Sequence, residues 1–190
     1  MSEPQTVLAG ATASEGLTVT IEEQGPTGMI TLRGDLSSPA LIAAVKEGFG
    51  AAVPATLTAA FNGDQKAVWM SPDELLLFCP YANAPAKAAA LGQALAGEHH
   101  MAVDVSDTRA VILVTGRGAQ ELMAKGAPLD LSDKAFPIGT ARRTHFAEIA
   151  VGIWRTGDEA WEIVCFQSYA QHLFDWLVAS SGDAASVGYF

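Results

Sequence analysis

Residues 69–74 read Trp-Met-Ser-Pro-Asp-Glu, and residues 154–159 read Trp-Arg-Thr-Gly-Asp-Glu. In each stretch Pro or Gly next to Asp favours a chain reversal, and the Trp supplies a large apolar anchor for the strand that precedes it. Each stretch is followed by an apolar run that ends in a cysteine, Cys79 or Cys165, and then by a tyrosine-alanine pair. The two stretches therefore predict two equivalent hairpins and an internal duplication of the chain.

The segments around these hairpins follow the same order in both halves. In the first half the pattern predicts a hairpin of strands over 17–21 and 29–32, a helix from Ser38 to Gly50, strands over 56–61, 67–70 and 74–79, and a helix over 85–96. In the second half it predicts strands over 102–105 and 110–115, a helix over 117–125, a strand over 144–150, the second Trp hairpin and a helix from about residue 168.

Both halves thus read strand, strand, helix, three strands, helix, which predicts an α+β fold of duplicated ββαβββα halves. The hairpins and the small number of βαβ crossovers indicate largely antiparallel sheets with the helices on one face. We expect a flexible tail over 1–16, a first pseudo-repeat over 17–98 and a second over 99–190, with the two repeats packed as one globular unit. The loop from Gly126 to Thr140 is the main insertion of the second half.

The composition excludes several classes of function. Of 190 residues only 17% are charged, and the net charge is −10, so nonspecific binding to nucleic acid or to an anionic membrane is not expected. No stretch has the length of a membrane-spanning helix, and the first residues lack the features of a signal peptide, so we expect a cytoplasmic protein. The sparse surface charge favours burial of some surface against a partner.

Candidate catalytic and metal-binding residues are few. Gly116-Arg-Gly118 follows an apolar strand but lacks the third glycine of a dinucleotide site, so we interpret it as a tight turn. His99 and His100 are adjacent and project in opposite directions from an extended chain, while His172 and Asp175 provide only two groups. Asp104 and Asp107 flank Ser106 in what reads as a turn. Cys79 and Cys165 are predicted to be buried, reduced thiols. We therefore expect no catalytic, cofactor-binding or metal site on this chain.

Two groups of residues are candidates for a partner interface. Arg142 and Arg143 concentrate basic charge in an acidic chain, and they are interpreted either as an anion or cross-subunit contact or as charge that protects an edge strand. Leu173, Trp176 and Leu177 are expected to share one face of the last helix, whereas Phe174 points elsewhere, and Tyr189-Phe190 end the chain. Exposed rings of this kind commonly act as anchors in protein interfaces.

Several motifs of the second half occur in an order that resembles the gamma subunit of heterotetrameric sarcosine oxidase. They are Val103-Asp-Val-Ser-Asp107, Val114-Thr-Gly116, Lys125-Gly-Ala-Pro-Leu-Asp-Leu131, Phe136-Pro-Ile-Gly139, Trp154-Arg-Thr-Gly-Asp158 and Phe174-Asp-Trp-Leu177. The resemblance covers most of the second half and, through the motif at 69–74, part of the first.

The resemblance implies a non-catalytic subunit that assembles with alpha, beta and delta chains and contributes to the stability of the complex. In that family the complex oxidises sarcosine to glycine with hydrogen peroxide as co-product. FAD, FMN, NAD, zinc and tetrahydrofolate belong to the partner chains. The family's fold is similar to the folate-binding domain of the glycine-cleavage aminomethyltransferase. No catalytic residue is carried over, because the family assigns none to this chain.

Two alternatives remain open at the level of the sequence. The chain could serve a complex that demethylates a related amine. It could also be a stand-alone folate-binding or aminomethyltransferase-like protein, in which case Asp104 or Asp107 should line a deep pocket. A shared fold does not decide between these functions.

Overall fold

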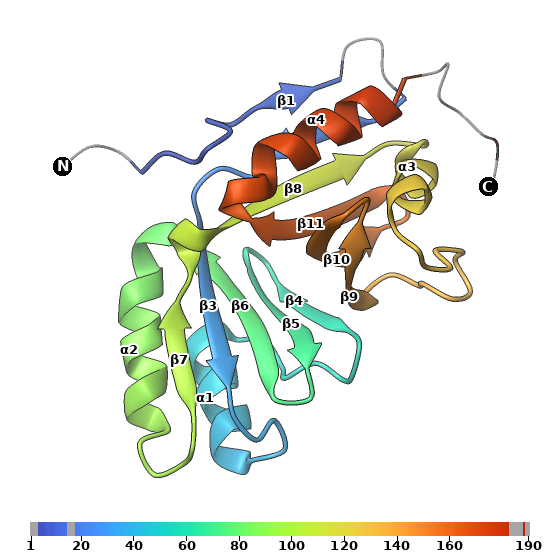
Figure 1. The fold of residues 1–190 in the computed structure, drawn as a ribbon. Coiled ribbons are helices and arrows are strands. Elements are labelled where there is room, and N and C mark those ends of the chain that lie inside the picture. Colours follow the sequence, from blue (N-terminus) through green and yellow to red (C-terminus); the bar gives the residue numbers. More distant parts are fainter. Residues whose placement is uncertain (1–3, 15–17, 183–187, 189–190) are drawn as a thin grey trace. The chain divides into compact units, whose positions relative to one another are not determined.

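The computed structural model describes residues 4–14, 18–182 and 188, and its backbone forms two compact units. The central unit consists of Pro26–Ser106, and the split unit consists of the chain up to Gly25 together with the chain from Asp107 onward. Figure 1 shows both units as a ribbon. Among the described residues, no helix has the combination of length and apolar character that crossing a membrane requires.

The central unit contains a five-stranded sheet with two helices. Its elements are β3 (Thr27–Arg33), α1 (Pro39–Phe49), β4 (Ala59–Asn62), β5 (Gln65–Ser71), β6 (Glu74–Pro80), the short η1 (Tyr81–Asn83), α2 (Ala84–Ala94) and β7 (Met101–Asp104). The strand order is β4-β5-β6-β3-β7, and every neighbouring pair is antiparallel. One buried cluster joins Leu41, Val45 and Phe49 of α1 with Leu91 of α2 and Leu75 of β6. Both helices therefore cover the same face of the sheet.

The predicted ends of α1 are confirmed in detail. The Ser38 hydroxyl accepts hydrogen bonds from the backbone N–H groups of Ala40 and Leu41, at 3.2 and 3.4 Å. Pro39 occupies the first helical position, where a missing N–H costs nothing. Gly50 ends the helix in the left-handed region, with φ 60°, and its N–H donates to the Lys46 carbonyl, as expected for a glycine after a helix.

The split unit contains a six-stranded sheet with two further helices. Its elements are β1 (Thr12–Ala13), β2 (Thr20–Glu23), β8 (Arg109–Thr115), α3 (Ala119–Gly126), β9 (Ala141–Phe146), β10 (Ile149–Gly157), β11 (Ala160–Phe166), η3 (Gln167–Tyr169) and α4 (Ala170–Ser180), while η2 (Ser106–Thr108) lies at the junction of the units. The order is β1-β2-β8-β11-β10-β9. Met123 of α3 and Leu177 of α4 share one core with Ile112, Ile153 and Trp161 of the sheet.

The duplicated ββαβββα order is confirmed, but the pairing of the first strand in each half differs from the prediction. β2 and β3 do not form a hairpin: β2 pairs with β8, and β3 pairs with β6 and β7. In the same way β7 and β8 belong to different sheets. Each half thus gives its first strand to the sheet of the other half. The compact units consequently do not coincide with the predicted repeats 17–98 and 99–190, and the packing of the repeats as one globular unit stays a prediction.

The two Trp motifs form equivalent hairpins, as predicted. β5 pairs with β6 around the first motif, and β10 pairs with β11 around the second. Each hairpin carries a register shift just before its turn, between Trp69 and Ser71 in one and between Arg155 and Gly157 in the other. The Trp154 side chain is fully buried, and its Nε1–H donates to Glu162 Oε2 at 2.9 Å.

Two other predictions are wrong. The described part of the predicted tail, residues 4–14, is ordered: Leu8 is buried in the core of the split unit, and the Glu23 carboxylate accepts hydrogen bonds from Thr6 Oγ1 and the Gly10 N–H. The predicted strand over 144–150 is interrupted by a turn at Ala147 and Glu148 between β9 and β10. Ala147 has φ 52°, a left-handed conformation that an alanine in the sequence does not signal.

Candidate functional site

Arg142 and Arg143 lie on β9, which is the last strand of the six-stranded sheet. The Arg142 guanidinium lies over the Phe136 ring, with 5.5 Å between its Cζ and the ring centroid, and its Nη1 donates to the Ala141 carbonyl. Arg143 is the next residue along the strand, so its side chain leaves the opposite face, and it is exposed. The prediction of an edge strand is confirmed, while a contact of these arginines with a partner stays a prediction.

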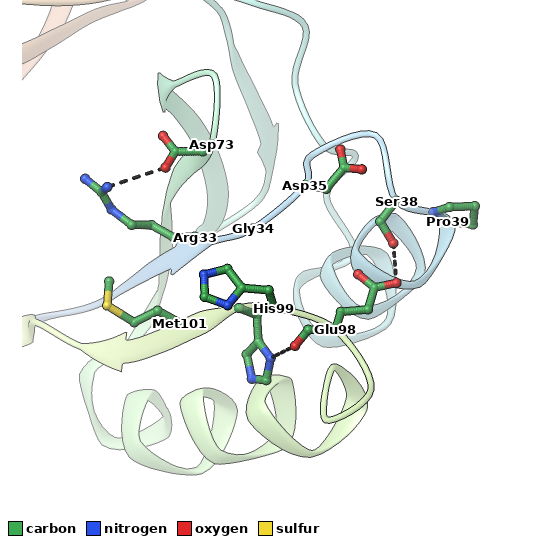
Figure 2. Close-up of a pocket in the computed structure, with 10 residues that line it drawn as sticks. Arg33, Gly34, Asp35, Ser38, Pro39, Asp73, Glu98, His99 and Met101 are labelled. Carbon is green, nitrogen blue, oxygen red and sulfur yellow. Dashed lines mark hydrogen bonds and ion pairs between the residues drawn. The ribbon is translucent and has the colours of Figure 1, made fainter.

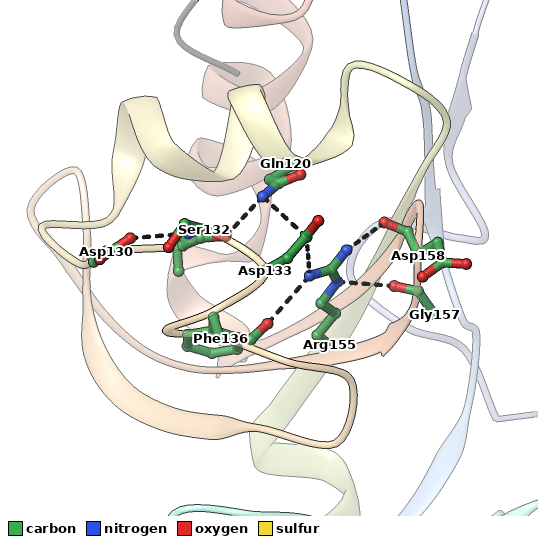
Figure 3. A network of polar contacts seen from close by, with 9 residues as sticks. Gln120, Asp130, Ser132, Asp133, Phe136, Arg155, Gly157 and Asp158 are labelled. Carbon is green, nitrogen blue, oxygen red and sulfur yellow. Dashed lines mark hydrogen bonds and ion pairs between the residues drawn. The ribbon is translucent and has the colours of Figure 1, made fainter.

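A buried arginine in the neighbouring strand, Arg155, organises the loop that precedes β9 (Figure 3). It is only 3% exposed. Its Nη1 donates to Asp133 Oδ1 at 2.6 Å and to the Phe136 carbonyl at 3.2 Å, while Nε and Nη2 donate to the carbonyls of Gly157 and Asp158. The guanidinium thus joins the loop over 127–140 to the turn between β10 and β11. Because these four hydrogen bonds come from three nitrogens of one planar guanidinium, lysine is a poor substitute.

The same loop is held at two further points. Gln120 Nε2 donates to the Leu131 carbonyl at 2.8 Å, and the Asp130 carboxylate accepts from the Ser132 N–H at 3.0 Å. Phe136 is buried, and its ring centroid lies 5.0 Å from that of Trp161. The loop is therefore a packed part of the split unit. It leaves Ile138 exposed, at 52%, close in sequence to the two arginines of β9.

The aromatic residues near the end of the chain differ in burial. Phe174 is 8% exposed and belongs to the core of the split unit, so its prediction as an exposed anchor is wrong. The reason is that the buried face of α4 is wider than helical spacing predicts, because Leu173, Phe174 and Leu177 are all buried. Trp176 is partly buried, and its ring meets Phe146 edge-on at 5.0 Å between centroids. Tyr189 and Phe190 lie outside the described residues.

Sequence reasoning missed both Arg155 and the exposed rings near the start of α4. Phe166 and Tyr169 are 49% and 51% exposed, and the Arg109 guanidinium lies over the Phe166 ring at 5.2 Å. A usable signal existed for Arg155. It occupies the position of Met70 in the first repeat of the Trp motif, so a charge replaces an apolar residue in a buried strand.

The central unit contains an open pocket of about 920 Å³ that is lined by several charged side chains (Figure 2). It lies beside the N-terminus of α1 and gathers Arg33, Asp35, Asp73, Glu98 and His99. Arg33 is paired with Asp73 at 3.5 Å and with Glu74 at 2.6 Å. Glu98 Oε1 accepts from the Ser38 hydroxyl at 2.6 Å, and Nδ1 of His100 lies 2.9 Å from the Glu98 carbonyl. The polar groups of the pocket are therefore engaged in internal contacts that stabilise the surrounding turns.

Local hydrogen bonds favour the ionised form of two carboxylates of this pocket. The side-chain hydrogen bond from Ser37 lowers the pKa of Asp35, and that from Ser71 lowers the pKa of Asp73. Asp35, Asp73 and Glu98 outnumber Arg33, so the rim of the pocket is acidic. Such a rim repels anionic ligands and favours cationic side chains.

The remaining candidates have structural roles. Asp104 and Asp107 are both exposed, and Asp104 Oδ1 accepts from the N–H and hydroxyl of Ser106, as in a turn. The Asp175 carboxylate accepts from Gln171. In the Gly116-x-Gly118 turn a Cβ on Gly118 would meet Thr18 Oγ1 at 2.5 Å, which explains the second glycine by close packing.

The cysteines do not have the environment of nucleophiles. Cys79 and Cys165 are both free and buried. Burial raises the pKa of the Cys165 thiol to about 12 and also raises that of Cys79. Since the thiolate is the reactive form, neither residue is suited to covalent catalysis. Over the part of the chain that the structure describes, no three His, Cys, Asp or Glu side chains are grouped so that they could hold a metal ion.

Comparisons with known proteins agree on one family. The model of the sarcosine oxidase gamma subunit family matches residues 33–183. The sarcosine oxidase subunit gamma of Corynebacterium sp. strain U-96 is 33% identical over 163 residues, which span 84% of this chain and 78% of that protein. The subunit gamma of an Arthrobacter species is 29% identical over 96% of this chain and 88% of its own length. With the subunit gamma of Corynebacterium sp. strain P-1 the identity is 34%, and the match spans 58% of that relative.

Solved structures show the same fold. A chain of heterotetrameric sarcosine oxidase from Corynebacterium sp. U-96 superposes with a TM-score of 0.81 and 28% identity, over 94% of this chain and 91% of that chain. The glycine cleavage system aminomethyltransferase T of Bartonella henselae superposes with a TM-score of 0.61 over 86% of this chain and 45% of that one. At 14% identity the second likeness concerns the fold alone. On the extent of the family match and of these alignments, the chain belongs to the sarcosine oxidase gamma subunit family.

Proposed function

We propose that this chain is the non-catalytic gamma subunit of a heterotetrameric sarcosine oxidase, and that it acts in the assembly and stability of the complex with alpha, beta and delta chains. The observation that carries the proposal is the superposition over 94% of the chain on a chain of a heterotetrameric enzyme. Membership of the gamma subunit family supports the same assignment.

The chemistry of the reaction is assigned to the partner chains. These would hold FAD, FMN, NAD, zinc and tetrahydrofolate, oxidise sarcosine to glycine with formation of hydrogen peroxide, and pass the one-carbon unit to tetrahydrofolate. Three observations support a structural part for this chain: the buried Cys165 thiol is protonated, Arg33 is paired with Glu74, and Glu98 accepts a hydrogen bond from Ser38. Which amine the complex oxidises would be decided by a partner's substrate site.

The alternative of a stand-alone folate-binding protein is disfavoured by one specific observation. It requires Asp104 or Asp107 in a deep pocket, whereas both carboxylates are exposed and Asp104 is engaged in a turn. The fold shared with aminomethyltransferase T does not by itself carry the activity of that enzyme.

Co-expression tests the proposal. The tagged chain is produced with the alpha, beta and delta chains of the same organism, and the expected result is one complex in which all four chains co-elute and sarcosine supports hydrogen peroxide formation. Omitting this chain should lower the yield and thermal stability of the assembly. Elution of the chain alone, or stoichiometric binding of tetrahydrofolate or flavin by the isolated chain, would contradict the proposal. Dimethylglycine in place of sarcosine tests the related-amine alternative.

A further inference from the structure

The exchanged strands β2 and β7 occupy equivalent places in the two sheets. β2 pairs with β8 in one sheet, and β7 pairs with β3 in the other. The hydrogen bonds that follow the strands also match: the Gln24 N–H donates to the Val111 carbonyl at 3.0 Å, and the Val105 N–H donates to the Met29 carbonyl at 2.8 Å. Glu23 of β2 therefore corresponds to Asp104 of β7, and the outer edges of the two strands are directly comparable.

In the split unit the outer edge of β2 is covered by an extended segment of the same chain. β1 pairs with β2 in register, Thr12 opposite Glu22, and the Glu23 N–H donates outward to the Ala11 carbonyl at 2.9 Å. The Glu23 carboxylate binds the Gly10 N–H at 2.8 Å, and it is left only 3% exposed. A short strand together with one carboxylate thus closes this edge.

In the central unit the corresponding edge of β7 is open among the described residues. β7 is the last strand of its sheet, and Asp104, at the position of Glu23, is exposed. Met101 and Val103 project from the strand with 41% and 44% of their surface exposed. α2 runs alongside β7 (Figure 1). The equivalent helix, α4, contacts β2 and leaves room there for β1, so a helix in this place does not block an added strand.

The charge around the open edge indicates what kind of segment fits. Met101 lines the same pocket as Asp35, Asp73 and Glu98, and Figure 2 shows it beside Arg33. Arg33 is already paired with Asp73 and Glu74, so acidic groups predominate there and at Asp104. A second copy of this chain, with its net charge of −10, would bring like charges together at this edge.

We propose that the outer edge of β7 is an acceptor for an extended segment of a partner subunit, which adds to the sheet as β1 adds to β2. The segment carries apolar side chains for Met101 and Val103 and a basic side chain for the Asp104 carboxylate. Its backbone pairs with the outward groups of Ala102 and Asp104, because donors alternate in direction along an antiparallel ladder. This inference rests on the proposed function, since the segment belongs to another chain of the oxidase.

The first test uses the full complex and surface changes on the two opposite edge strands of the same sheet. M101K/V103K places two ammonium groups on β7, where they repel a basic segment and remain solvated in the free chain. F61K is the control, because Phe61 is equally exposed, at 44%, on the other edge strand of the same sheet. We expect M101K/V103K to reduce recovery of the four-chain complex by roughly tenfold, a change that corresponds to about 1.4 kcal/mol, while F61K and the melting temperatures of both free variants stay near wild type.

The second test is amide hydrogen exchange on wild-type chain, free and in the complex. Protection of Ala102 and Asp104 that appears only in the complex, together with cross-links from β7 to a partner's segment, supports the inference. If the wild-type chain assembles and these amides exchange equally fast in both states, or M101K/V103K assembles like F61K, the inference is overturned while the proposed function stands. Protection that depends on the concentration of the free chain would assign the edge to a second copy. Failure of wild type to assemble overturns both proposals.

Discussion

At the scale of single residues, the chain's chemistry is that of buried groups that stabilise a fold. Arg155 contacts one carboxylate and three carbonyl oxygens that belong to different parts of the split unit. Hydrogen bonds from a charged donor contribute more than neutral ones, and a buried carbonyl that loses its donor is left desolvated. Asp133 is itself largely exposed, so the carbonyl contacts, more than the ion pair, account for the stabilising effect.

Arg155→Ala should therefore lower the free energy of unfolding by about 3 kcal/mol, and Arg155→Lys should recover only part of this. Urea denaturation of the full chain measures the effect. Arg117, an exposed arginine in the turn before α3, provides the control, and Arg117→Ala should change stability by less than about 0.5 kcal/mol. Equal effects of the two alanine substitutions would show that the network contributes little.

The thiol of Cys165 gives a prediction about pH. Its folded-state pKa is raised from 9.0 to about 12 by burial, so the folded protein retains this proton over a range in which the unfolded chain releases it. The contribution to stability is complete below pH 9.0 and is lost as the pH rises toward the folded value. Iodoacetamide at pH 8 should leave Cys165 unmodified in the native protein and alkylate it after unfolding in urea. Rapid alkylation of the native chain would disprove the buried, protonated thiol.

At the scale of elements, local signals predicted where helices and strands form but not which strands pair. The capping residues of α1, Ser38 and Gly50, can be recognised from a few neighbouring residues alone. The strand pattern around Ile21 and Ile30 is equally clear, yet alternation is the same whichever sheet a strand joins. The turn at Ala147 escaped prediction because it lacks the Gly or Asn that a positive φ favours.

The same limit applies to the predicted interface. Of the two interpretations of Arg142 and Arg143, the edge strand agrees with the position of β9 in its sheet, and a contact with a partner stays a prediction. Phe174 was misplaced, because helical spacing alone does not say how wide a stripe the neighbouring elements cover. The β7 edge was not recognisable in the sequence at all: its exposure depends on the exchange of strands between halves.

The segment before β1 contributes one buried side chain, Leu8, to the core of the split unit. Leu8 is 7% exposed within the core, whereas its neighbour Val7 is 49% exposed. Leu8→Ala should cost about 2 kcal/mol of unfolding free energy, and Val7→Ala should be almost neutral, both measured by urea denaturation. If the two variants unfold alike, the segment does not contribute its buried leucine to the native state, and the original expectation of a flexible tail would be restored.

At the scale of the whole molecule, the exchange of first strands makes the two repeats depend on each other. A cut in the loop before β7 leaves a first fragment that contains β2 without its partner β8 and lacks β7, the partner of β3. The second fragment has the reciprocal defect. We therefore expect that fragments separated between Gly97 and Val103 do not fold independently.

The central unit is expected to fold better as a fragment than the first repeat, because it is one continuous segment with all five strands of its sheet. A fragment over 26–106 keeps both partners of β3, and it omits β2, which pairs only with strands of the split unit. A fragment over 17–98 has nearly the same length but breaks the sheet at its edge. We expect 26–106 to show the more cooperative thermal transition by circular dichroism and the slower amide exchange in β3, since only this fragment retains the β3–β7 ladder and the contact of α2 with β7. Were 17–98 to melt cooperatively and 26–106 to behave as an unfolded chain, the repeats themselves, rather than the strand-exchanged units, would be the folding domains of this subunit.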